Sequence, residues 1–413
     1  MFQTNQGPSF PAHQFLFTGT SAPIQYNDPN DPCISMPSEF PCWEWFDEEG
    51  VTNTGNSAVN GCIAVAGAYA YQIDPNSHEA LLPNPLGFSS GFPCYDHPTL
   101  SDLLEGGNPR FEWKYYGRAA GDIWTAPNAI NHICMPSGYG GNCQGSSWGA
   151  NVAAVLPTKS DAAPFLTDIT NCNLSHVSWV IPDGNWSDHN QAIPGDGGPS
   201  WVAAIVNGIG QSPCTDLVNG VNVPYWQDSV ILITWDDWGG LYDDVLPPDC
   251  PPLQPCTGYA NSGSNPPNGQ QYVYGFRVPL LVVSAYAKRN YISGANAGAK
   301  PDCLHNTYCH DFGSILNFIE YAFGTGGQPL GSPYGIGTQN WPYADYFAPD
   351  GHFEQPSNPY SLYDFFDFKQ IQTPTFTPIA GAKYQPNCFH NPTAQGCFEL
   401  TYPSDPDNDA NED

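Results

Sequence analysis

Two adjacent carboxylates follow an apolar segment in the second half of the chain. Asp236 and Asp237 come directly after Ser229–Trp235 (SVILITW) and shortly before Gly239 and Gly240. Carboxylates at the carboxyl end of a strand can reach a divalent cation, and glycines let the backbone turn tightly beside it. A solvated turn rich in Asp and Gly has the same composition. The segment therefore indicates either a metal site or a surface turn.

The sequence around these carboxylates resembles a known family. Thr234–Val245 (TWDDWGGLYDDV), continued by Leu246-Pro247-Pro248, resembles the D-E-x-G-G-x-x-D-H-V-P-P signature of the phosphoesterase family, which includes bacterial and fungal phospholipases C and acid phosphatases. Asp237 stands where the signature has Glu, which keeps a carboxylate. Asp244 stands where it has His, which removes an imidazole and leaves the role of that position open. Further segments resemble the family in the same order, namely WKYY at 113–116 and LYDFFDF at 362–368, so the resemblance extends over nearly the whole chain.

The resemblance implies a serine nucleophile surrounded by histidines. Ser9, in GPSFPAH, corresponds to the nucleophile region and His13 is its neighbour; His189 matches an S-D-H element. His310 corresponds to a His-bearing segment before a helix, with His305 as the alternative. A hydroxyl held against a cation can attack phosphorus in line, and a histidine can stabilise phosphoryl oxygens or protonate the leaving group. Outside the family context, a serine in a Pro/Gly loop is usually a turn residue and a loop histidine is usually exposed.

The resemblance also implies a divalent metal ion bound by Asp236, Asp237 and Ser9. Its identity stays open among calcium, magnesium, manganese and zinc. The family pattern begins with a metal-binding Glu-Asn element, which residues 1–12 do not supply. We therefore expect a chain truncated at its N-terminus relative to the family. The expected function is metal-dependent hydrolysis of phosphate esters, of the phospholipase C or acid phosphatase type. The alternatives are an inactive fragment or non-catalytic secreted relative, and a calcium-stabilised carbohydrate-binding protein.

Alternating apolar segments predict an α/β fold. Three short β-branched segments read as buried strands of a mostly parallel sheet, and two periodic segments read as helices. These are the strands Val177–Pro182, Ser229–Trp235 and Val278–Tyr286 and the helices Trp201–Ile209 and Asp311–Phe323, the last capped by Asp311 and ended by Gly324. Together with the resemblance, they imply a three-layer, alkaline-phosphatase-like sandwich with loop-rich insertions and its site at the carboxyl ends of the strands. We expect one domain over 1–402 and a disordered acidic tail over 403–413.

The charge balance narrows the class of partner. The chain has 10 Lys and Arg against 40 Asp and Glu, a net charge of −30. This balance disfavours a nucleic-acid partner held in a basic groove. No apolar run reaches the roughly 20 residues of a membrane span. The expected partner is a phosphate-ester substrate, with phospholipid among the candidates. The many aromatic residues would suit a choline-like cation, although no particular residue is indicated.

The cysteines indicate an oxidising compartment. There are 14, many of them in short-range pairs that bracket loops rich in Pro, Gly or Asn, and none with C-x-x-C spacing. The expected pairs are Cys33–Cys42, Cys134–Cys143, Cys250–Cys256, Cys303–Cys309 and Cys388–Cys397. Sequons at Asn173 and Asn185 are compatible with export. Residues 1–5 do not resemble a signal peptide. We therefore expect a secreted or extracytoplasmic protein whose leader is not in this sequence.

Overall fold

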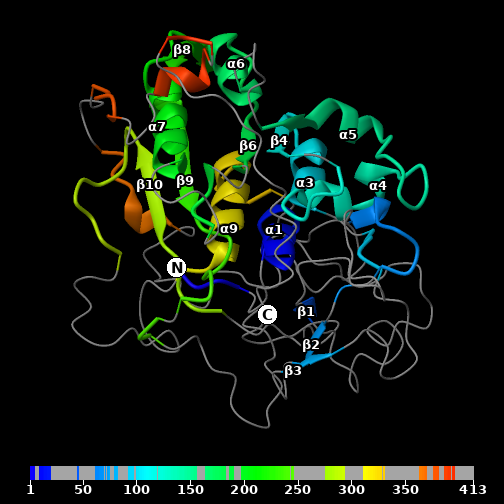
Figure 1. The fold of residues 1–413 in the computed structure, drawn as a ribbon. Coiled ribbons are helices and arrows are strands. Elements are labelled where there is room, and N and C mark those ends of the chain that lie inside the picture. Colours follow the sequence, from blue (N-terminus) through cyan, green and yellow to red (C-terminus); the bar gives the residue numbers. More distant parts are fainter. Residues whose placement is uncertain are drawn as a thin grey trace.

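The computed structural model describes about half of the chain, and the elements in Figure 1 belong to that half. The described residues are 1–4, 9–19, 44–45, 61–68, 70, 72–74, 79–81, 92–96, 99–118, 120–155, 163–182, 186–189, 197–241, 243–245, 275–293, 310–327, 329–330, 362–369, 375–380, 386–391 and 393–395. The helices are α1 (Ser9–Thr18), α3 (Leu100–Gly106), α4 (Asn131–Cys134), α5 (Ser146–Asn151), α6 (Pro164–Thr170), α7 (Gly197–Gly210), α8 (Tyr225–Asp228) and α9 (Phe312–Phe323). The strands are β1 (Glu44–Trp45), β2 (Gln72–Asp74), β3 (Glu79–Leu81), β4 (Trp113–Gly117), β5 (Val152–Ala154), β6 (Val177–Val180), β7 (Thr215–Val218), β8 (Val221–Pro224), β9 (Val230–Thr234) and β10 (Leu280–Ser284).

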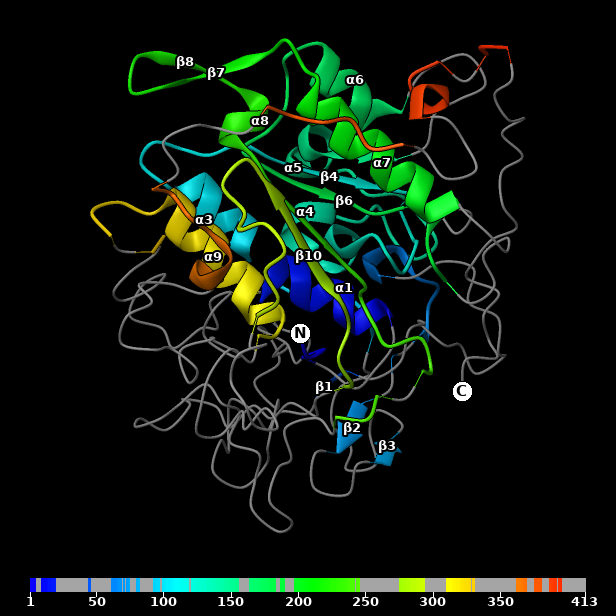
Figure 2. The ribbon, with the colours of Figure 1, turned by 90° about the vertical axis from the view of Figure 1, so that its left-hand side faces the viewer.

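A parallel sheet lies at the centre of the fold. Its order is β5-β4-β6, and β4 pairs in parallel with both neighbours. The WKYY segment forms β4, as the sequence predicts, and the segment beginning at Val177 forms β6. Figure 2 shows these strands between α6 and α7 on one side and α1 and α9 on the other. The predicted α/β fold is therefore confirmed.

Side chains of β4 alternate between two apolar cores, as expected for a strand covered on both faces. Trp113 and Tyr115 pack in the core that contains α1 and α9 residues. Tyr116 packs in the other core, with Leu166 of α6 and Trp201 of α7. Each of the three β4 side chains is at most 2% exposed. Burial on both faces holds the helix layers at fixed positions relative to the sheet.

The second strand pair differs from the sequence prediction. The segments 229–235 and 278–286 form β9 and β10, but they pair antiparallel, with Thr234 opposite Leu280 and Val230 opposite Ser284. Most of the side chains of both strands are partly rather than fully buried. An apolar, β-branched run indicates a strand but carries no information about its direction. The prediction of parallel pairing is wrong for this pair, although both strands exist where expected.

Both predicted helices are confirmed. Trp201–Ile209 lies within α7. The N-cap of α9 is Asp311, whose Oδ1 accepts a hydrogen bond from the Ser314 N–H at 3.1 Å, while Ser314 Oγ accepts one from the Asp311 N–H at 3.0 Å. This reciprocal pair satisfies two of the backbone donors left free at a helix start. Gly324 caps the other end.

Three disulfides lie within the described residues. Cys134–Cys143 is confirmed, whereas Cys62–Cys94 and Cys172–Cys214 join residues 32 and 42 positions apart and were not predicted. Cys388 is disulfide-bonded, but its expected partner, Cys397, lies outside the described residues. The other three expected pairs lie outside them as well. A rule based on short spacing cannot find bonds that depend on tertiary contact.

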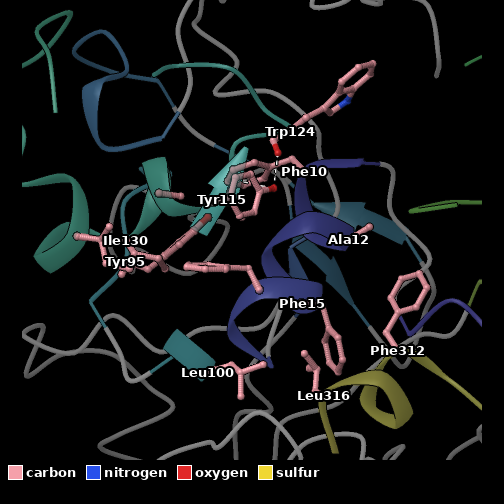
Figure 3. Packing of buried hydrophobic residues seen from close by; sticks show 14 of the residues in the cluster. Phe10, Ala12, Phe15, Tyr95, Leu100, Tyr115, Trp124, Ile130, Phe312 and Leu316 are labelled. Carbon is pink, nitrogen blue, oxygen red and sulfur yellow. Dashed lines mark hydrogen bonds between the residues drawn. The ribbon is translucent and has the colours of Figure 1, made fainter. Parts of the chain in front are cut away.

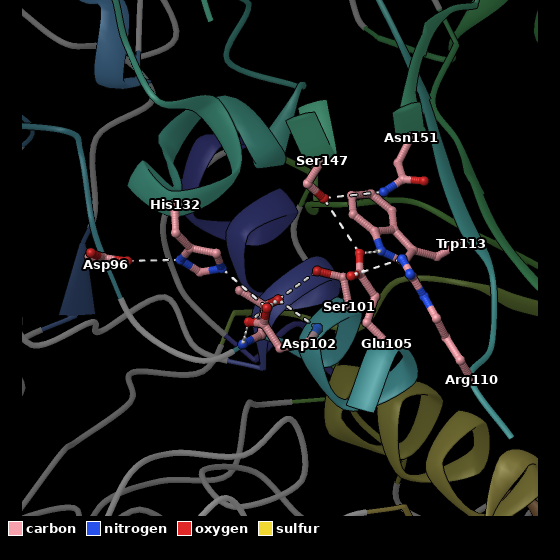
Figure 4. A network of polar contacts seen from close by, with 10 residues as sticks. Asp96, Ser101, Asp102, Glu105, Arg110, Trp113, His132, Ser147 and Asn151 are labelled. Atoms are coloured by element: carbon pink, nitrogen blue, oxygen red, sulfur yellow. Dashed lines mark hydrogen bonds and ion pairs between the residues drawn. The ribbon is translucent and has the colours of Figure 1, made fainter. Parts of the chain in front are cut away.

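A polar network fixes the region around α3 and α4. His132, the second residue of α4, places Nδ1 2.8 Å from Asp96 Oδ1 and Nε2 3.2 Å from Asp102 Oδ1. Figure 4 shows His132 between these two carboxylates. Asp102 also accepts a hydrogen bond from the N–H of Thr99, the N-cap of α3. The network connects α3, α4 and the segment around Asp96.

In the part of the chain that the structure describes, no helix combines the length and apolar character needed to cross a membrane.

Candidate active site

The candidate site is built on the first helix, α1. Ser9 is the first residue of α1, where the sequence had indicated a loop. Pro11 is compatible with this start, because a proline in the first turn needs no hydrogen-bonded N–H. Phe10, Ala12 and Phe15 are at most 2% exposed and are packed in the core (Figure 3), so the helix is held firmly. The N-terminus of a helix favours anions, because its free N–H groups and dipole point toward them.

Ser9 faces the paired carboxylates after β9. Its Oγ donates a hydrogen bond to Asp237 Oδ2 at 3.0 Å, although 228 residues separate the two in sequence. Asp237 Oδ1 accepts a hydrogen bond from the Gly239 N–H at 2.6 Å. Gly239 and Gly240 have φ values of 59° and 71°, the left-handed region that glycine adopts without strain. The tight turn predicted beside the carboxylates is therefore present, and it orients Asp237 toward the hydroxyl.

The neighbouring carboxylate contacts the imidazole one turn further along α1. His13 Nε2 lies 3.2 Å from Asp236 Oδ2, and the exposed fractions of these side chains are 7% and 29%. Ser9 and His13 are four residues apart, so they share one face of the helix. Burial alone would raise the pKa of Asp236, but the hydrogen bond and charge of His13 outweigh burial and lower that pKa to about 2. Asp236 is therefore anionic at neutral pH.

Trp124 connects His13 to His189. Its ring centroid lies 6.5 Å from that of His13 and 5.8 Å from that of His189. The backbone N–H of His189 donates a hydrogen bond to Ser187 Oγ at 3.1 Å. Through Trp124, the S-D-H element is placed beside the site. Trp124 itself was not predicted, because the surrounding DIWTAP matches no motif that indicates chemistry.

His310 lies in a polar cluster of its own. Its Nε2 is 3.3 Å from Asp364 Oδ1 and 3.2 Å from Ser293 Oγ. Asp364 also accepts hydrogen bonds from Ser293 Oγ at 2.6 Å and from Tyr291 OH at 2.8 Å. Burial raises the pKa of Asp364, but His310, Ser293 and Tyr291 outweigh it and hold that pKa below its usual value. These contacts relate His310 to the LYDFFDF segment, and none of them is with Ser9 or Asp236. His305 lies outside the described residues.

Comparison with known proteins identifies the family. The phosphoesterase family model matches residues 1–326, which is more than three quarters of the 413 residues. The chain belongs to the phosphoesterase family. This confirms the resemblance drawn from TWDDWGGLYDDV.

Curated relatives of this phosphoesterase match over a shorter region. It is 30% identical over 165 residues to phospholipase C B of Mycobacterium tuberculosis, which covers 39% of this chain and 27% of the relative. It is 24% identical over 169 residues to a non-hemolytic phospholipase C of Pseudomonas aeruginosa, covering 38% of this chain and 21% of the relative. A non-hemolytic phospholipase C of Burkholderia pseudomallei is 26% identical over 163 residues, with 38% and 20% covered. The match thus spans only a fifth to about a quarter of these relatives.

Of the two positions at which this phosphoesterase departs from the signature, Asp244 lies at the surface. The Asp244 side chain is 96% exposed, and its Oδ1 is 3.6 Å from Arg277 Nη2. Arg277 binds the preceding residue more closely, with Nη2 donating to Asp243 Oδ1 at 2.8 Å, and this hydrogen bond lowers the pKa of Asp243. Asp244 therefore adds surface charge beside an ion pair.

The donor set suits a cation that shares its coordination with substrate and water. Asp236, Asp237 and Ser9 supply two carboxylates and a hydroxyl, all oxygen donors. No group of three or more His, Cys, Asp or Glu side chains that could hold a metal ion occurs among the described residues. Mg²⁺ is commonly bound in this way, by one or two carboxylates together with substrate phosphate and water. Asp236, Asp237 and Ser9 could take part in such a site, and they do not form the closed set of four ligands typical of structural zinc.

Proposed function

We propose that this protein hydrolyses phosphate esters, with Ser9 as the nucleophile. The observation that carries the proposal is the hydrogen bond from Ser9 Oγ to Asp237, formed at the N-terminus of a buried helix. Membership of the phosphoesterase family supports the reaction class. The relatives named phospholipase C support a phosphodiester lipid as substrate. The signature at Thr234–Val245 also fits an acid phosphatase type acting on monoesters.

In this proposal each side chain has a defined task. Asp236 and Asp237 would hold a divalent cation, which would stabilise the phosphoryl charge and lower the pKa of the hydroxyl beside it. Ser9 directs its proton at Asp237, so an oxygen lone pair is free to attack phosphorus in line. The N-terminus of α1 favours the negative phosphoryl oxygens. His189 protonates the departing oxygen, and water then hydrolyses the phosphoserine.

His13 and His310 support this chemistry from two directions. His13 holds Asp236 in its anionic form and fixes its orientation. His310, anchored by Asp364, supplies the third imidazole of the proposed constellation. The disulfides of the described residues support an oxidising, extracytoplasmic location for the reaction.

The alternative is a non-catalytic relative that lacks a complete metal site. It is favoured by the small donor set, since the described residues offer only two carboxylates and a hydroxyl around the candidate metal position. Such a protein would still bind phosphate esters at the helix N-terminus. It would not turn them over.

The test is hydrolysis of p-nitrophenyl phosphate and p-nitrophenyl phosphorylcholine by the purified full chain. Chelation should abolish activity and added Mg²⁺, Ca²⁺, Mn²⁺ or Zn²⁺ should restore it. Ser9→Ala should lower kcat/KM at least about 1,000-fold, because removing a nucleophile removes the covalent route. Ser146→Ala is the matched control, since Ser146 also begins a helix but is exposed. Hydrolysis by Ser9→Ala at the wild-type rate would show that Ser9 is not the nucleophile.

A further inference from the structure

Trp124 is held rigidly by its backbone. The Trp124 N–H donates to Asp122 Oδ1 at 2.8 Å. The Trp124 carbonyl accepts a hydrogen bond from Tyr115 OH at 2.5 Å, drawn as a dashed line in Figure 3. Tyr115 belongs to β4 and is 1% exposed, so this bond ties the tryptophan to the parallel sheet. The backbone that carries the indole is therefore fixed, which helps to preorganise a binding contact.

The indole of Trp124 carries a buried donor without an acceptor. The residue is 4% exposed, and its Nε1 has no hydrogen-bond partner among the described residues. More than about 90% of buried polar groups in folded proteins are paired, since an unpaired one costs about 1–3 kcal/mol. A buried donor that is held in place and unpaired needs an explanation, and one explanation is a ligand that supplies the acceptor.

The location of the indole identifies the kind of ligand. Its ring contacts His13, which binds Asp236, and His189 of the S-D-H element. An indole N–H is only a donor, and it remains a donor at every accessible pH, unlike an imidazole. Its natural complement is therefore an oxygen acceptor, such as the anionic oxygens of a phosphate ester.

We propose that Trp124 is a substrate-binding residue whose indole N–H donates a hydrogen bond to an oxygen of the phosphate ester. The inference rests on the proposed function, because it assigns the ester to the site formed by Ser9, His13 and His189. It adds a neutral side-chain donor beside the imidazoles of His13 and His189. The contact recognises the phosphate group, which phosphomonoesters and phosphodiesters share.

A second tryptophan provides the matched control. Trp201 is 3% exposed and its Nε1 also lacks a hydrogen-bond partner in the described part of the chain. Its ring packs against Phe389, with centroids 5.2 Å apart, in the core on the α7 side. The described ring contacts of Trp201 include neither His13 nor His189. Replacing each tryptophan with phenylalanine removes the same buried N–H from two different places.

The kinetic test compares Trp124→Phe with Trp201→Phe. Trp124→Phe should lower kcat/KM about 10- to 100-fold for both p-nitrophenyl phosphate and p-nitrophenyl phosphorylcholine, because a hydrogen bond to a charged group is lost. The inhibition constant for inorganic phosphate should rise by a similar factor, while Trp201→Phe leaves all three values within about twofold of wild type. An unchanged inhibition constant in Trp124→Phe would overturn the proposal. So would an effect confined to the choline ester, which would indicate a cation-binding ring face instead.

A binding measurement separates this proposal from the proposed function. In ¹⁵N indole spectra of the wild-type protein with Mg²⁺, inorganic phosphate should shift the signal that Trp124→Phe lacks, and should leave the Trp201 signal in place. This shift in a protein that hydrolyses neither ester would support the contact and reject the catalytic function. A Trp124 signal that does not move, with or without movement of other signals, would overturn the contact.

A crystal structure of the wild-type protein with inorganic phosphate keeps the test independent of any variant that does not fold. A phosphate oxygen within about 3.2 Å of Trp124 Nε1 would support the proposal. Phosphate bound elsewhere, or no bound phosphate, would contradict it.

Discussion

Two histidine–carboxylate pairs in this molecule have similar contact distances but differ in burial and in the groups around them. His13 is 7% exposed, contacts Asp236, and shares its helix face with a hydroxyl directed at Asp237. His132 is 37% exposed and contacts two carboxylates, Asp96 and Asp102. The described contacts of His132 include no hydroxyl placed as a nucleophile. A histidine–carboxylate pair is therefore a candidate for catalysis only when it is buried and lies beside a group that can react.

Both contacts lower the pKa of a carboxylate, that of Asp236 at the first and that of Asp102 at the second. At the first, hydrogen bonds overcome burial and lower the pKa of Asp236 to about 2. At the second, burial opposes protonation of His132, but the hydrogen bonds that its ring donates to Asp102 and Asp96 outweigh burial and raise the pKa of His132 to about 9. The contact with His13 keeps Asp236 anionic, and an anionic carboxylate can bind a cation. The contacts with Asp96 and Asp102 keep His132 protonated, and these ion pairs stabilise the folded state.

Of the variants that test the two histidine–carboxylate arrangements, Asp236→Asn should have the largest effect. Asp236→Asn should lower kcat/KM for p-nitrophenyl phosphate at least about 100-fold and weaken Mg²⁺ binding measured by calorimetry, because a ligand charge is lost. Asp96→Asn is the matched control, since Asp96 also contacts a histidine. Unchanged metal affinity in Asp236→Asn would remove this carboxylate from the site, and equal losses in both variants would erase the distinction between the two arrangements.

A smaller effect is expected from the histidines themselves. His13→Gln should lower kcat/KM about 10- to 100-fold, because Asp236 loses the group that orients it. His132→Gln should leave kcat/KM within about twofold of wild type. Steady-state kinetics at pH 7 on both variants, with circular dichroism to check folding, would test this. A catalytic loss in His132→Gln that matched the loss in His13→Gln would contradict the comparison.

The smallest expected effect is on stability at the exposed network. The pKa of His132 in the folded state, about 9, lies above its ordinary value of about 6.5. Protonated His132 therefore contributes its full stabilisation of the fold below about pH 6.5, and this contribution is lost as the pH rises through about 9. Urea unfolding should therefore show His132→Gln less stable than wild type near pH 6, by at most about 1 kcal/mol because the pairs are partly exposed. The difference should vanish near pH 10. A difference that grew with rising pH would show that the pKa shift has the opposite sign.

Much of the site could be predicted because its residues stand in short sequence patterns that determine local structure. The apolar run before Asp236 and Asp237 predicts a strand end, the glycines predict a turn, and the structure has both. The capping residues of α9 were likewise readable from Asp311 and Gly324. These features depend on neighbours in sequence, where propensity and hydrogen-bonding rules apply directly.

What could not be predicted depends on distant partners. Nothing in the sequence near Trp124 shows that its ring will contact His13 and His189. Cys172 and Cys214 are brought together by the packing of α6 and α7, and no spacing rule selects that pair. The direction of β10 relative to β9 is set by how the chain returns to the sheet. Each of these requires knowledge of the assembled fold.

The antiparallel pairing of β9 and β10 has an evolutionary consequence. Because Thr234 lies opposite Leu280, the connection from 235 to 279 leaves and re-enters the ladder at one edge, next to Asp236. Residues can be gained or lost within such a connection without shifting the register of either strand, at a cost that rises slowly with length. Insertions or deletions placed there would change what surrounds Asp236 while leaving the β9–β10 pairing intact.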